Sequence, residues 1–63
     1  MSASTILQEA QKLYGVSARL DTLAEKYPGA SQALLGISEG IRNSGTLLEV
    51  LVATKIAPLA GLQ

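Results

Sequence analysis

The segment KYPGAS, residues 26–31, lies near the middle of the 63-residue chain and decides its fold. Pro28 biases Tyr27 away from the helical region of backbone conformation, and Gly29 permits a turn. We therefore expect one helix to end near residue 27 and another to begin near residue 30. Two helices joined by so short a turn form an αα-hairpin, which predicts an all-α fold with one helical-hairpin domain over residues 1–63.

The first helix is predicted over about 5–27. Thr5 followed by Gln8 fits a capping box, in which each side chain satisfies a backbone N–H of the first turn. Beyond this start, apolar residues recur at the spacing that places them on one side of a helix. We expect this intrachain stripe to face the second helix, and its members are Ile6, Leu13, Val16, Leu20, Leu23 and Tyr27.

The second helix is predicted over about 30–57, with Pro58 and Gly61 ending the regular structure. An alternative interpretation breaks this helix near 43–46, because four poor helix formers follow one another there and Gly45 suits a helix C-terminus. The apolar residues keep one helical phase across that segment, which a turn would normally disrupt. A continuous second helix is therefore the preferred interpretation.

Self-association is the means of stabilisation that the composition leaves open. A domain of about 60 residues buries only about 60% of the surface that its unfolded chain exposes, so its own core is marginal. The sequence has no Cys and no His, which excludes disulfides and the commonest metal ligands. Five basic residues balance five acidic ones, so little electrostatic repulsion keeps copies apart. A homo-oligomer, with a dimer favoured, is the expected state.

The segment 47–57 supports this expectation, because its apolar residues point in every direction around the helix axis and one neighbouring helix covers only one side. A second hairpin would complete a four-helix bundle. Gly36, Gly40 and Ser44 are spaced by four residues and would let another backbone come close. The predicted oligomer interface consists of Leu34, Ile37, Gly40, Ile41, Ser44, Leu47, Leu48, Leu51, Val52 and Ile56.

Charged residues in the sequence show no arrangement that is typical of a catalytic or metal site. Asp21 and Glu25 share a helix face that we expect to be solvated, and Glu9 with Lys12 and Glu39 with Arg42 have the spacing of ordinary helix ion pairs. The segment 40–46 spaces its glycines like a phosphate-binding loop but has Thr46 where that loop needs Lys. We expect no catalytic residues, no metal and no cofactor, and the absence of a basic patch argues against nucleic acid.

The sequence therefore predicts a non-catalytic, self-associating helical protein that acts as a structural or protein-interaction module. Its role would be scaffolding, or the regulation of a protein partner through a surface of the bundle. Two alternatives are a membrane-associated small helical subunit and a carrier that holds an apolar small molecule within a helical bundle. Membrane association is disfavoured because the apolar C-terminal stretch is short and carries Glu49 and Lys55. No secretory signal pattern is visible, so a cytoplasmic location is expected.

Overall fold

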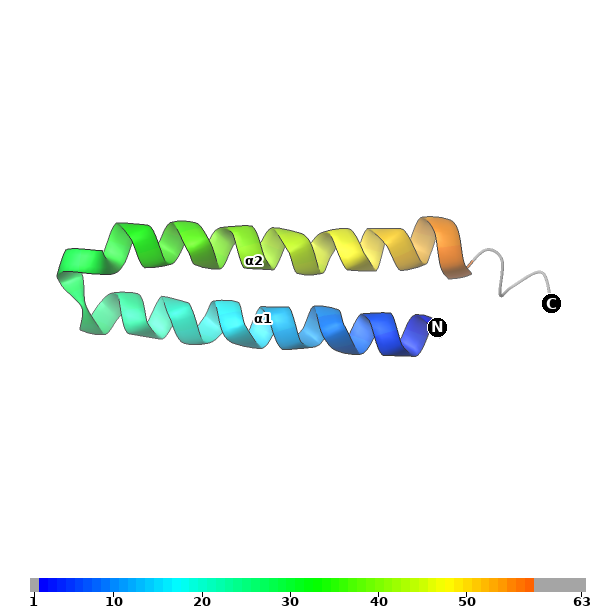
Figure 1. The fold of residues 1–63 in the computed structure, drawn as a ribbon, viewed down its shortest axis with the longest axis horizontal. Coiled ribbons are helices and arrows are strands. Elements are labelled where there is room, and N and C mark those ends of the chain that lie inside the picture. Colours follow the sequence, from blue (N-terminus) through cyan, green and yellow to red (C-terminus); the bar gives the residue numbers. More distant parts are fainter. Residues whose placement is uncertain (1, 58–63) are drawn as a thin grey trace.

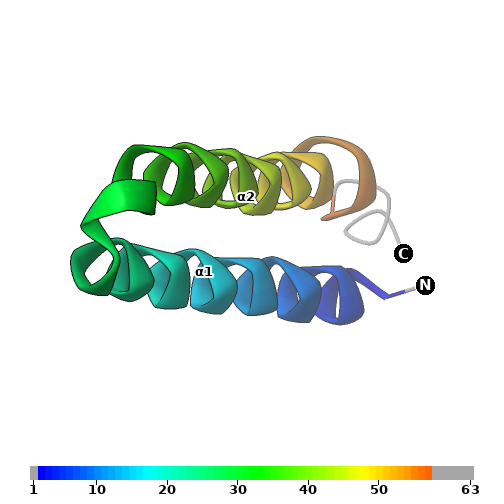
Figure 2. The ribbon, with the colours of Figure 1, turned by 60° about the vertical axis from the view of Figure 1, so that its left-hand side comes forward.

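The computed structural model describes residues 2–57, which form two antiparallel helices lying side by side (Figure 1). Helix α1 spans Ala3–Lys26 and helix α2 spans Ser31–Leu51, and the short 3-10 helix η1, Pro28–Ala30, joins them. A π-helical turn, η2, continues α2 over Val52–Ile56. The rotated view in Figure 2 shows the same pairing along the length of both helices. The predicted all-α helical hairpin is confirmed.

The first helix begins earlier than the sequence predicted, and the capping box at Thr5 and Gln8 is wrong. Ser2 is the N-cap, and its Oγ accepts a hydrogen bond from the backbone N–H of Thr5 at 3.2 Å. The two hydroxyl oxygens, Ser2 Oγ and Thr5 Oγ1, are also 2.9 Å apart. Ser is among the best N-cap residues, and the amide three positions later is the one that its side chain reaches.

The turn forms where the sequence predicted it. The backbone N–H of Tyr27 donates to Leu23 O at 3.0 Å, and the N–H of Ala30 then donates to Tyr27 O at 2.9 Å. Pro28 occupies the first position of η1, where its missing N–H costs no hydrogen bond. None of the described glycines has a positive φ, so Gly29 does not serve the turn through a left-handed conformation.

Helix α2 is continuous through residues 43–46, and the alternative with a break there is wrong. The hydroxyls of this segment are satisfied inside the helix, because Ser44 Oγ donates to Gly40 O at 3.1 Å and Thr46 Oγ1 donates to Arg42 O at 3.2 Å. The helical conformation extends to Ala57 through η2. Pro58 and Gly61, which were expected to end the regular structure, lie outside the described residues.

Candidate functional site

The two helices meet along small residues that recur every seven positions, which we call the central row. Its members are Ala3, Ala10, Ser17 and Ala24 in α1, and Ser31, Ser38, Gly45 and Val52 in the second half of the hairpin. Six of the eight are buried, and Ala3 and Ser31 are half-buried. A seven-residue repeat keeps the same rows of two helices in contact over many turns, and small side chains let the two backbones approach closely.

Two buried serines join the helices at the middle of the central row. Ser38 Oγ lies 2.9 Å from Ser17 O, Ser17 Oγ lies 3.0 Å from Ser38 O, and the two hydroxyl oxygens are 2.6 Å apart. A side chain as short as serine reaches the opposite backbone carbonyl only where the helices are close. These reciprocal contacts therefore fix the register, with Ser17 opposite Ser38.

The serine pair is hydrogen-bonded to an ion pair at one edge of the hairpin. Ser38 Oγ donates to Asp21 Oδ1 at 2.6 Å, and Arg42 Nη2 donates to Asp21 Oδ2 at 2.8 Å. Each hydroxyl carries one proton, so Ser38 donates either to the carboxylate or to the Ser17 carbonyl at a given moment. Every buried polar side-chain atom in the described part of the chain has a hydrogen-bond partner.

Tyr14 makes the second polar contact between the helices, on the same edge. Its hydroxyl donates to the Glu49 carboxylate and lies 3.2 Å from Thr46 Oγ1. Its ring packs over Gly45, where an added Cβ would lie 2.9 Å from Tyr14 Cε1 and 3.3 Å from Ala10 O. The segment that looked like a helix break is thus a place where a glycine admits an aromatic ring between two helices.

The contact with Glu49 also changes the acidity of the Tyr14 phenol. The hydrogen bond to the carboxylate raises the pKa of Tyr14 above its ordinary value of 10.0, because the carboxylate accepts the proton that ionisation would remove. The hydrogen bond with Thr46 opposes this effect, whereas desolvation and the negative charge of Glu49 add to it. The phenol is therefore kept protonated and acts as a hydrogen-bond donor.

The hairpin has a polar face and an apolar face on opposite sides of the central row. The contacts of Tyr14, Asp21, Arg42 and Glu49 show that residues four positions after the central row share one side, the polar face. Residues three positions after the row, or one before it, lie on the other side. We call this the apolar face. Glu9 and Ser44 are its polar positions, and its aliphatic members are Ile6, Leu13, Val16, Leu20 and Leu23 in α1 with Leu34, Ile37, Ile41, Leu48 and Leu51 in α2.

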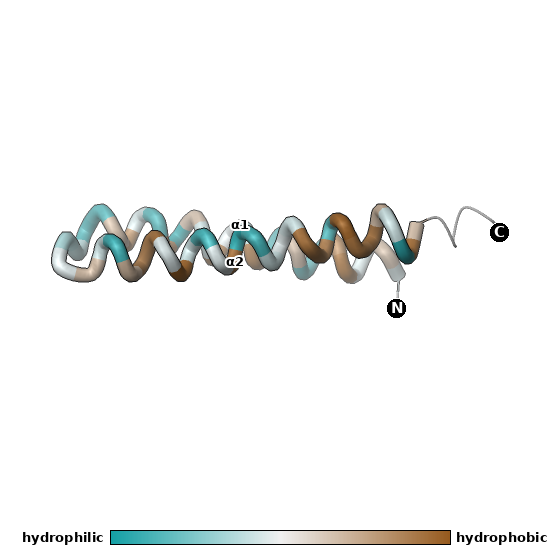
Figure 3. The backbone as a smooth tube through the Cα atoms, turned by 90° about the horizontal axis from the view of Figure 1, so that it is seen from above, coloured by the Kyte–Doolittle hydropathy of each residue, from teal (hydrophilic) through white to brown (hydrophobic). Residues whose placement is uncertain are grey.

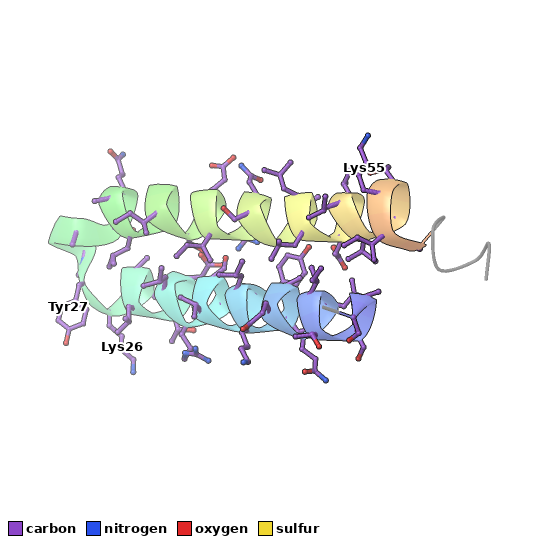
Figure 4. All side chains as sticks on the ribbon, turned by 45° about the vertical axis from the view of Figure 1, so that its right-hand side comes forward. Lys26, Tyr27 and Lys55 are labelled. Carbon is purple, nitrogen blue, oxygen red and sulfur yellow. The ribbon has the colours of Figure 1, made fainter. Side chains whose placement is uncertain are left out.

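The structure places the predicted intrachain stripe beside the helix contact, with the central row between the helices. Ile6 is buried and Leu13, Val16 and Leu20 are half-buried, whereas Leu23 is 38% exposed. Tyr27 is 59% exposed and points away from the helices at the turn (Figure 4). Small side chains fill the narrow space between the helices, so bulky ones are displaced to its side.

The residues of the predicted oligomer interface fall into three groups within the single chain. Val52 is already buried, and Leu34, Ile41, Leu48 and Ile56 are half-buried. The exposed group consists of Ile37, Gly40, Ser44, Leu47 and Leu51. Side chains at positions 36 and 40 would meet no atom within 4 Å, so Gly36 and Gly40 are not required by the hairpin itself.

The apolar segment at the end of α2 is only partly covered by α1. Leu47 is 67% exposed, Val50 49% and Leu51 41%. Figure 3 shows the hydrophobic residues gathered in this part of α2, near the end of the hairpin where the N-terminus lies. Lys55 points away from the helices there (Figure 4), so its charge does not enter the contact with α1.

One of the two predicted helix ion pairs forms in the structure, and the other does not. Glu9 and Lys12 form the expected ion pair at 3.2 Å. The pair between Glu39 and Arg42 is wrong, because Arg42 turns across the hairpin to Asp21. The sequence reasoning missed this contact and the serine pair. The repeat of small residues every seven positions in both halves of the chain is visible in the sequence and would have indicated the serine pair.

Residues 2–57 enclose no pocket, and none of their acidic side chains gather into a group of three or more that could hold a metal ion. Among the described helices, none combines the length and apolar character needed to cross a bilayer. No match was found to a protein-family model, to a curated protein or to a solved structure.

Proposed function

We propose that this chain is a non-catalytic, self-associating helical protein, and that the apolar face is where two copies meet to form a four-helix bundle. Its role would then be structural, or the presentation of a bundle surface to a protein partner. The observation that carries this proposal is the separation of the hairpin into two faces. One face holds the Tyr14 and Asp21 networks, and the other consists almost entirely of aliphatic side chains.

The composition of the apolar face supports a protein contact. At the positions of α1 and α2 that define this face, Glu9 is the only charged residue. Leucines and isoleucines there remain half-buried or exposed because the small central row brings the two helices together without covering them. Burial of apolar surface stabilises a protein by about 25 cal/mol per Å². If the apolar face stayed exposed to water, the chain would lose the stabilisation that burying this face provides.

The size of the face suits a stable dimer. Helix α1 has 24 residues, which at about 1.5 Å per residue gives a length of about 36 Å. Two helices with axes 8–10 Å apart present a width of about 18 Å. The product is about 650 Å² per copy and about 1,300 Å² in total, which lies within the range of specific protein interfaces of about 1,200–2,000 Å².

Sedimentation equilibrium over a range of concentrations tests the proposal with two matched variants. Ile37 is 56% exposed on the apolar face, and Leu35 is 47% exposed on the opposite side of α2. We expect the wild-type chain to sediment at twice its 6.5 kDa mass. Ile37→Glu should raise the dissociation constant at least tenfold, because it places a charge in a desolvated contact, whereas Leu35→Glu should leave it unchanged.

Three results would contradict the proposal. The first is a wild-type monomer at high micromolar concentration. The second is an equal effect of Ile37→Glu and Leu35→Glu. The third is a chain that floats with phosphatidylcholine or phosphatidylserine vesicles as a monomer, since the apolar face would then be covered by lipid.

A further inference from the structure

We infer that the two copies pair with their turns at the same end of the bundle, so that α1 of each copy packs against α2 of the other. This inference rests on the proposed function, because it specifies how the two apolar faces meet. Symmetric dimers are most often related by a twofold axis. With the helices aligned, one choice of axis places α1 on the second copy's α2, and the other places α1 on α1 with the turns at opposite ends.

A row of cations along α1 distinguishes these two arrangements. Lys12, Arg19 and Lys26 are exposed, and each follows the central row by two positions, which places them along the border of the apolar face on the outer side of α1. Ion pairing with Glu9 at 3.2 Å offsets the charge of Lys12. Arg19 and Lys26 have no ion pair in the described part of the chain.

The corresponding border of α2 carries no charge. The positions that follow its central row by two are Ala33, Gly40 and Leu47, all of them exposed. An added Cβ at Gly40 would meet no atom within 4 Å, and Leu47 is 67% exposed, so this border has room for the side chains of a second copy. The α2 border is thus small, apolar and uncovered.

These two borders are complementary to each other. Pairing α1 with α1 would bring two cationic rows together along one edge, and the like charges would repel. By the register of Ser17 and Ser38, pairing α1 with α2 instead lays the long stem of Arg19 between Ala33 and Gly40 of the second copy. The stem of Lys12 then lies between Gly40 and Leu47, and the charged ends stay in water.

The position of Glu9 supports the same arrangement. With the turns at the same end, the register set by Ser17 and Ser38 brings Glu9 level with Ser44 of the second copy. The Ser44 hydroxyl can donate to that carboxylate by turning away from Gly40 O, its acceptor within α2 at 3.1 Å. With the turns at opposite ends and the two α1 helices overlapping over their full length, Glu9 would lie level with Leu20 of the second copy and would be desolvated without a hydrogen-bond donor.

A distance measurement between spin labels tests the arrangement. The chain has no Cys, so Gly29→Cys gives one label per copy, at an exposed turn position with nothing within 4 Å of its Cβ. In a dimer with its turns at the same end, the labelled positions should lie about 10–20 Å apart, because adjacent helix axes are about 8–10 Å apart. With the turns at opposite ends, they should lie about 36 Å apart, the length of a 24-residue helix at about 1.5 Å per residue.

Neutralising the cationic row tests whether its charges determine the arrangement of the two copies. In the Gly29→Cys chain, replacing Lys12, Arg19 and Lys26 by Gln should add a second population near 36 Å, because the repulsion that disfavours it is gone. A dimer whose wild-type distance is the long one overturns the arrangement, and an unchanged short distance after neutralisation overturns the role of the charges. Sedimentation of the same samples separates these outcomes from a monomer, which would overturn the proposed function itself.

Discussion

Replacing Gly45 by Ala tests the close packing of the two helices most directly. In an isolated helix this substitution should stabilise, because Ala is favoured over Gly by about 1 kcal/mol. In the hairpin the new methyl group would lie 2.9 Å from Tyr14 Cε1, 3.1 Å from Tyr14 Cζ and 3.3 Å from the carbonyl oxygen of Ala10. The ring can move only by disturbing its contacts with Thr46 and Glu49, and the carbonyl belongs to the backbone of α1.

The magnitude follows from the balance of these two effects. Overpacking of a close contact costs about 1–3 kcal/mol, which equals or exceeds the gain of helix propensity. Gly36→Ala is the matched control, because its Cβ meets no atom within 4 Å and it lies away from the apolar face. We expect Gly36→Ala to raise the free energy of unfolding by about 1 kcal/mol. The free energy of unfolding of the Gly45→Ala variant should therefore be about 1–3 kcal/mol lower than that of the Gly36→Ala variant.

Thermal unfolding followed by circular dichroism, at one fixed protein concentration, measures this difference. A change of 1 kcal/mol shifts the melting temperature of a domain of this size by about 4–8 °C, so the two variants should differ by about 4–24 °C. In a Tyr14→Ala background, Gly45→Ala should recover part of the helix-propensity gain, because the two closest atoms are gone and the Ala10 carbonyl at 3.3 Å remains. If Gly45→Ala stabilises the chain as much as Gly36→Ala does, the helices are not in close contact at this point.

Two further predictions concern the polar contacts. Ser38→Ala should destabilise the chain by about 1.5–3 kcal/mol, measured by urea unfolding, because it removes a hydrogen bond to a charged carboxylate. Ser17→Ala should destabilise it by about 0.5–1.5 kcal/mol. A reversed order of the two variants would contradict the hydrogen-bond network. Because the pKa of Tyr14 is raised in the folded state, the unfolded chain releases its phenol proton first, and stability should fall as the pH rises above 10.0. Tyr14→Phe should reduce this fall and Tyr27→Phe should not, and equal slopes in all three proteins would refute the assignment.

The sequence predicted the hairpin because its deciding features are local. Pro28 acts on the conformation of its immediate neighbour, and the apolar phase of α2 extends across residues 43–46 whatever lies against them. The poor helix formers of that segment did not break the helix, since packing against α1 and hydrogen bonds within α2 outweigh a propensity difference of about 1 kcal/mol per residue. The existence and approximate length of both helices could therefore be predicted from the sequence.

The contact surface was harder to predict, because apolar periodicity locates the side of a helix that avoids water only to within a stripe about 100° wide. The central row and the apolar face both fall inside such a stripe. Leu13 and Leu20 carry the stronger hydrophobic signal, yet Ser17 lies between the helices because its volume is small. The ion pair of Asp21 and Arg42 depends on the register across the hairpin, which no local spacing reveals.

The short connection η1 also determines the order in which contacts between the helices can form. Ala24 and Ser31 lie opposite each other beside the turn, whereas Ala3 and Val52 meet only after almost the whole described chain has been enclosed. The entropy lost on closing a loop grows with the length of chain inside it. Pairing therefore begins at the turn and spreads toward the termini. The contacts between the helix ends farthest from the turn form last and are the first to break when the hairpin opens.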